Sequence, residues 1–88
     1  MEGKMSSLTL GLLRFDEERY GVYLKRIMIG MVFISPKADH IEIRVRYGVD
    51  EVIHSDNVPL MPLDDPCIMA HVSRATSIIQ TKIREATA

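Results

Sequence analysis

The stretch Ile27-Met28-Ile29-Gly30-Met31-Val32-Phe33-Ile34 carries no polar or charged side chain, and it is followed by His40-Ile41-Glu42-Ile43-Arg44-Val45-Arg46-Tyr47, in which polar and apolar residues alternate. Alternation is typical of a strand with one buried and one solvated face, whereas a continuous apolar run is typical of a strand buried on both faces. The sequence therefore predicts that strand 28–34 turns through residues 35–39, with Pro36 early in the loop, into strand 40–47. A domain this small seldom covers both faces of a sheet with its own chain, so we expect a partner to cover one of them.

Other segments with β character lie on both sides of this hairpin. The residues after Gly48 favour a strand at 51–54. Residues 8–15 and 20–24 favour a first hairpin around a polar loop. A helix is the alternative there, because Asp16 is a suitable N-cap and several apolar residues then repeat at helical spacing, namely Tyr20, Leu24, Ile27, Met28 and Met31. The helix is disfavoured by Gly21.

The last quarter of the chain has the pattern of one amphipathic helix. Asp64 or Asp65 is a suitable N-cap, and Pro66 is well placed in the first helical turn. One stripe of the helix is apolar and comprises Ile68, Val72, Ala75, Ile79, Ile83 and Ala86. Ile78 lies outside this stripe. We expect the stripe to pack on one face of the sheet.

These elements predict one α+β domain over residues 1–88: a small antiparallel meander of three to five strands with a C-terminal helix on one face. Residues 7–56 are the β-rich part, residues 57–64 form a connection with two prolines, and residues 65–86 form the helix. We expect residues 1–6 to be frayed, with either Met1 or Met5 as the start.

Composition restricts the classes of function. The net charge is −1, with acidic and basic residues spread evenly, so no segment has the positive field typical of proteins that bind the nucleic-acid backbone. Cys67 is the single cysteine, which rules out an intramolecular disulfide and fits a reducing, cytoplasmic location. The longest apolar run, residues 27–34, is far below the ~20 residues that span a bilayer as a helix, so no membrane partner is expected.

The sequence offers little for catalysis. Cys67 and His71 are four residues apart near the start of the helix, a spacing that lets a histidine activate a thiol. The alternative is a structural cysteine beside a solvated histidine, because Asp64 and Asp65 oppose formation of a thiolate. His40, His54 and His71 show no metal-ligand spacing. We therefore expect no catalytic residues, no metal and no cofactor.

Two interaction sites remain as hypotheses. Strand 28–34 and the helix suggest an apolar partner interface made by Met28, Met31, Phe33 and Ile78. It would serve a homodimer, or an inhibitor or adaptor bound to another protein, of the accessory kind that phages and mobile elements carry. The alternative is a module for a small ligand, a nucleotide or single-stranded nucleic acid, because arginines and aromatics on a sheet face hold such ligands. Its candidate residues are Lys25, Arg26, Tyr23, Arg44, Arg46 and Tyr47.

Overall fold

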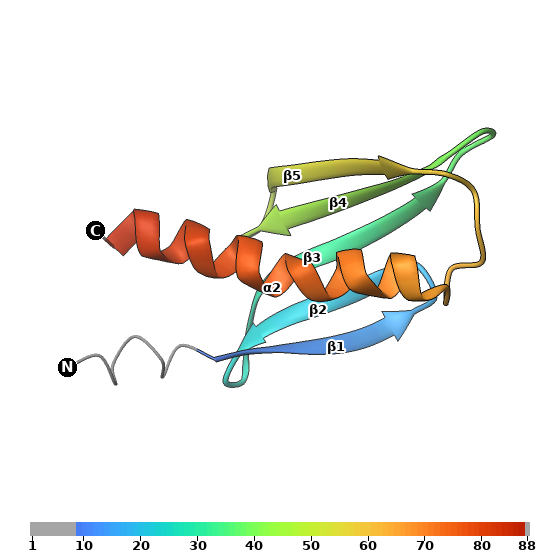
Figure 1. Cartoon of the computed structure of the whole chain (residues 1–88). Helices are drawn as coiled ribbons and strands as arrows, with labels where there is room; N and C mark the ends of the chain where they lie inside the picture. The colour runs from blue at the N-terminus through green and yellow to red at the C-terminus, as the bar shows by residue number, and fades with distance from the viewer. Residues whose placement is uncertain (1–8, 88) are drawn as a thin grey trace.

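The computed structural model describes residues 9–87. In this part of the chain, five strands precede one helix: β1 (Leu10–Asp16), β2 (Arg19–Leu24), β3 (Ile27–Pro36), β4 (Ile41–Tyr47), β5 (Glu51–Val58) and α2 (Pro66–Thr87) (Figure 1). The strands form one sheet in the order β1-β2-β3-β4-β5, and each pair of neighbours is antiparallel. The predicted α+β meander with a C-terminal helix is thus confirmed, in its five-stranded form.

The structure forms the first hairpin, and the helical alternative for residues 16–27 is wrong. Glu17 and Glu18 form a two-residue turn, and the Asp16 carboxylate accepts a hydrogen bond from the Glu18 amide at 2.8 Å, which fixes the turn locally. The Ile34 amide donates to the Glu18 carbonyl at 2.8 Å, so the turn is also tied to β3. The fraying predicted for residues 1–6 lies outside the described residues.

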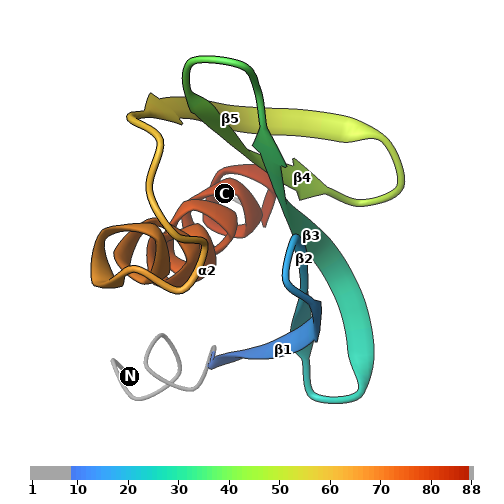
Figure 2. The same ribbon diagram turned by 90° about the vertical axis from the view of Figure 1, so that its right-hand side faces the viewer.

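Three irregularities interrupt the pairing of the strands. Arg14 pairs with Tyr20 and Asp16 pairs with Arg19, which leaves Phe15 as an extra residue in β1. Val22 pairs with Gly30 and Tyr23 pairs with Met28, which leaves Ile29 as an extra residue in β3. In the same way His54 pairs with Val45 and Val52 with Arg46, which leaves Ile53 as an extra residue in β5. Bulges of this kind bend a strand and increase its twist. Figure 2 shows the result: the sheet curls around α2, with β1 and β5 on either side of the helix.

The helix is fixed by its cap and by its apolar stripe. Asp65 is the N-cap, because its carboxylate accepts a hydrogen bond from the Cys67 amide at 2.9 Å. Ile68, Val72, Ala75 and Ile79 are fully buried against the sheet, whereas Ala86 at the end of the predicted stripe is exposed. The core on the other side of this contact comes from β2 to β5 and consists of Tyr20, Val22, Val32, Ile34, Ile41, Ile43, Val45 and Val58.

The opposite face of the sheet has no second layer in the described chain. β1 and β2 extend the sheet at its edge instead of folding back over β3. The connection between β5 and α2 packs on the helix side, where Met61 and Leu63 contact the core. We call the uncovered side the open face. No helix within residues 9–87 has the length and apolar character needed to cross a membrane.

The β2–β3 turn contains a strained residue and yields a stability prediction. Lys25 has φ 59°, a left-handed conformation that glycine adopts without strain. We expect Lys25→Gly to stabilise the domain by about 0.5–1 kcal/mol in urea unfolding, as relief of strain exceeds the added freedom of the unfolded chain. Arg26→Gly is the matched control, because Arg26 has no positive φ. The prediction would be contradicted if Lys25→Gly and Arg26→Gly lowered the free energy of unfolding by the same amount.

Candidate interaction surface

The register places side chains from all five strands on the open face. Directly paired residues of antiparallel strands point to the same side of a sheet. One row across the sheet runs through Leu13, Gly21, Met31, Arg46 and Val52, and the next runs through Arg19, Phe33, Arg44 and Ser55. A third row contains Gly11, Tyr23 and Met28. The β1–β3 half of the open face is therefore mainly apolar, and the β4–β5 half carries two arginines.

An apolar patch, defined as Leu13, Phe15, Tyr23 and Met28, occupies the β1–β3 half. Leu13 is 53% exposed, Met28 44% and Phe15 42%, while Tyr23 is half-buried. The patch closes over Gly21: a Cβ atom there would lie 2.9 Å from the Tyr23 ring, 3.1 Å from Phe15 and 3.2 Å from the Met28 sulfur. Because glycine has no side chain, the rings of Tyr23 and Phe15 and the thioether of Met28 can all pack directly over residue 21.

An Arg–Phe cluster, defined as Phe33, Arg44 and Arg46, lies next to this patch. The guanidinium carbon of Arg44 is 5.6 Å from the Phe33 ring centre and that of Arg46 is 5.0 Å away, so both cations lie over one ring. The Nε atoms of both arginines are buried and have no hydrogen-bond partner. Neither arginine forms an ion pair with any residue in 9–87. Two positive charges therefore share one ring without a counter-ion from the described chain.

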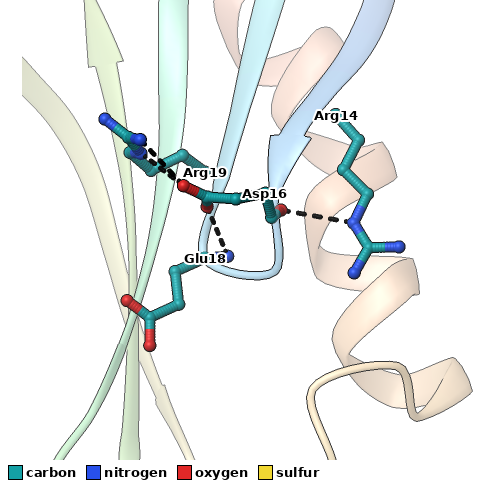
Figure 3. Close-up of polar contacts among 4 residues, drawn as sticks. All are labelled: Arg14, Asp16, Glu18 and Arg19. Carbon is teal, nitrogen blue, oxygen red and sulfur yellow. Dashed lines mark hydrogen bonds and ion pairs between the residues drawn. The ribbon is translucent and has the colours of Figure 1, made fainter.

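Acidic groups border the cluster. Asp16 holds Arg19 in a two-pronged contact, with its Oδ2 at 2.9 Å from Nε and 2.8 Å from Nη2 (Figure 3). The hydrogen bonds from Arg19 and from the Glu18 amide keep the pKa of Asp16 below its ordinary value. Arg19 is thus neutralised locally. Figure 3 also shows the Glu18 carboxylate directed away from Arg14, which lies on the side of α2. Glu42 lies beyond Arg44 on β4, 3.9 Å from the Lys37 ammonium.

The structure brings together only some of the residues predicted to bind a ligand. Arg44 and Arg46 lie in the cluster. Tyr23 and Lys25 line a shallow hollow of about 340 Å³ at the β1 edge, together with Gly11, Leu12 and Leu13. Arg26 is exposed in the β2–β3 turn. Tyr47 packs against the core on the helix side, so it is not on the same face as the two arginines.

The residues predicted to form a partner interface are also divided between the two faces. Met28, Met31 and Phe33 lie on the open face, but Met31 is only 7% exposed. Ile78 lies on the other side of the molecule, where it and Ile53 line a hollow of about 260 Å³ between β5 and α2. The interface hypothesis therefore keeps its β3 residues on one surface, and Ile78 belongs to another.

Sequence reasoning did not identify Leu13, Phe15 and Gly21 as parts of this surface. The alternation of β1 contained a signal, because Leu13 and Phe15 are two residues apart and each is apolar. Gly21 gave no such signal, since only the register places it under the rings. The apolar patch is thus a product of tertiary structure.

The suggested thiol pair is not assembled. His71 Nδ1 lies 3.3 Å from Asp56 Oδ2, and the same oxygen is 2.9 Å from His54 Nε2, so His71 joins α2 to β5 instead of serving Cys67. Cys67 itself is exposed. Within the described residues, no group of three histidine, cysteine, aspartate or glutamate side chains is arranged to hold a metal ion.

The Asp56 junction predicts a pH dependence. The hydrogen bond from His54, together with the nearby charges of His54, His71 and Arg74, holds the pKa of Asp56 below its ordinary value. A carboxylate with a lowered pKa stabilises the fold above its unfolded pKa, and this contribution is lost as the pH falls below about 4. We expect Asp56→Asn to be less stable than wild type at pH 6 and to lose less of its stability between pH 4 and pH 2. Urea unfolding at each pH measures this, and parallel curves for both proteins would contradict it.

Comparison with known proteins gave no match to a family model, to a curated protein or to a solved structure.

Proposed function

We propose that this protein is a non-enzymatic interaction module that binds another protein surface through the open face. The observation that carries the proposal is the apolar patch, in which Leu13, Phe15 and Met28 are each exposed by two-fifths or more, on a face that no element within residues 9–87 covers. Contiguous apolar surface of this kind, bordered by polar residues, is typical of protein–protein contact sites.

The composition of the surface supports the same function. Aromatic residues, methionine and arginine are enriched at protein interfaces, and the open face combines all three in Phe15, Phe33, Met28, Arg44 and Arg46. Methionine also adapts to irregular contours of a partner. A small accessory regulator, acting as an inhibitor or adaptor or as a homodimer, fits a surface of this kind better than an enzyme does.

The test removes the apolar patch and leaves the fold intact. Leu13→Ser with Met28→Ser is the interface variant, and Leu60→Ser, which removes an equally exposed leucine from the connection before α2, is the control. Sedimentation of each purified protein reports self-association, and quantitative affinity capture from the source cells reports other partners. We expect the association constant of the interface variant to be at least tenfold lower than the association constants of wild type and of the control. An interface variant that associates as well as the control would refute the proposal.

The Arg–Phe cluster favours a second candidate function, the binding of a nucleotide or a single-stranded nucleic acid. A base can stack against the half-buried Phe33, and the two guanidinium groups, which form no ion pair within residues 9–87, can meet a phosphate. A thermal-shift series with nucleotides and short RNAs tests this candidate. A shift that disappears in Arg44→Glu with Arg46→Glu would support it, and the absence of any shift would exclude these ligands.

A further inference from the structure

We propose that the partner segment bound by the open face is both apolar and acidic: its apolar side chains cover the apolar patch, and one or two of its carboxylates meet Arg44 and Arg46. This inference rests on the proposed function and names the chemistry of the partner. It makes the Arg–Phe cluster part of the docking surface.

The charges of the cluster favour the binding of an anion from outside the described chain. Arg44 and Arg46 occupy alternate positions on β4 and both lie over Phe33, so their like charges are close and repel each other. Guanidinium groups form their strongest contacts with carboxylates and phosphates, to which they donate parallel hydrogen bonds. Because both guanidinium groups lie over the Phe33 ring and their Nε atoms are buried, the two side chains lose little freedom when an anion binds.

The surroundings favour one or two carboxylates over the backbone of a nucleic acid. Asp16 and Glu18 border the cluster on the β1–β2 side, and Glu42 follows on β4. Asp16 neutralises Arg19, which would otherwise extend the positive surface. A chain of phosphates that crosses the sheet would meet these acids, whereas a short acidic stretch next to apolar residues fits between them.

The geometry of the sheet sets the spacing within the partner segment. Neighbouring strands lie about 4.8 Å apart, so the two to three strand spacings from the apolar patch to β4 measure roughly 10–14 Å. An extended peptide covers that distance in about three to four residues, at roughly 3.3 Å per residue. The bound segment is therefore expected to carry its apolar residues and its carboxylates about four positions apart.

The test uses designed peptides with the intact protein. The probe is a fluorescent peptide with leucine and phenylalanine, three serines and then two glutamates. One control peptide has lysines for the glutamates, and another has serines for the leucine and phenylalanine. The protein variants are Arg44→Glu with Arg46→Glu, the milder Arg44→Gln with Arg46→Gln, and Arg14→Glu with Arg74→Glu, which changes the net charge equally on the helix side. Circular dichroism melting confirms that each variant folds.

We expect wild type to prefer the acidic peptide and the glutamate variant to prefer the lysine peptide. Wild type and the Arg14/Arg74 variant bind the acidic peptide at least tenfold more tightly than either control peptide, the glutamine variant loses most of this preference, and the glutamate variant prefers the lysine peptide. Equal binding of acidic and lysine peptides, no binding at millimolar concentration, or tighter binding of a ten-nucleotide oligouridine would each overturn the inference. A wild type whose arginine-dependent association is with itself would overturn it too, since the occupant would then be a second copy.

The capture experiment described under the proposed function separates failure of the acidic-partner inference from failure of the proposed function. Capture that depends on Leu13 and Met28 but not on Arg44 and Arg46 leaves the interaction module in place and removes only the acidic partner. Capture that depends on neither pair removes the proposed function itself.

Discussion

Gly30→Ala is expected to destabilise the domain by about 3 kcal/mol or more, which is at the upper end of overpacking effects. A Cβ atom at Gly30 would lie 2.5 Å from the backbone oxygen of Arg46 and 2.7 Å from the Ile79 Cδ1 atom. The first contact is with backbone of the neighbouring strand, so no change of rotamer relieves it. The strand β4 would have to move away from β3, and its core residues would move with it.

Urea or thermal unfolding followed by circular dichroism measures this effect. Gly11→Ala is the matched control, because a Cβ atom at Gly11 would have no heavy atom within 4 Å. The control is expected to leave stability within about 0.5 kcal/mol of wild type. Equal stability of the two variants would show that β3 and β4 do not approach each other at Gly30 as described.

Ile79→Ala is expected to cost about 3–4 kcal/mol, within the range for large-to-small substitutions in a core. Ile79 is fully buried between α2 and the sheet and belongs to the main core cluster. Its loss leaves a cavity that the paired strands can fill only in part. Ile78→Ala is the control on the same helix. Because the Ile78 side chain is half-buried, we expect this variant to lose only about 1 kcal/mol of unfolding free energy. Chemical unfolding of both variants measures the difference, and equal losses would contradict it.

The two substitutions are expected to be coupled. In Gly30→Ala with Ile79→Ala, the contact between the new Cβ atom and the Ile79 Cδ1 atom disappears, while the contact with the Arg46 carbonyl remains. The double variant should therefore be more stable than the sum of the single effects predicts, by about 1 kcal/mol. Strict additivity would indicate that the backbone contact alone determines the cost at Gly30.

Local signals in the chain were sufficient for most of the secondary structure. The alternation in residues 40–47 predicted β4, and the Asp65-Pro66 start with the apolar stripe predicted α2. Tyr47 could have been placed as well, since it shares the alternation of Ile43 and Val45 and so belongs to the helix side. These features depend on neighbours within a few residues, which is why the sequence contains them.

Other features required the pairing of distant residues. The extra residues Ile29 and Ile53 have no signature of their own, and they curve the sheet around α2. Through this curvature Ile78, which lies off the apolar stripe, comes to line a hollow with Ile53 of β5. The choice between helix and hairpin for residues 16–27 was also decided by non-local contacts, including the hydrogen bond from the Ile34 amide to the Glu18 carbonyl.

The sequence by itself determined that strand 27–34 is apolar on both of its faces and that the chain has one amphipathic helix to cover the sheet. Only the tertiary structure decided that β1 and β2 join the edge of the sheet, so that no element within residues 9–87 covers the second face of β3. The physical reason is that hairpin formation depends on local pairing, whereas the direction in which a hairpin packs depends on the register with β3 and on the curvature of the whole sheet. The open face, its apolar patch and the two arginines over Phe33 follow from that placement.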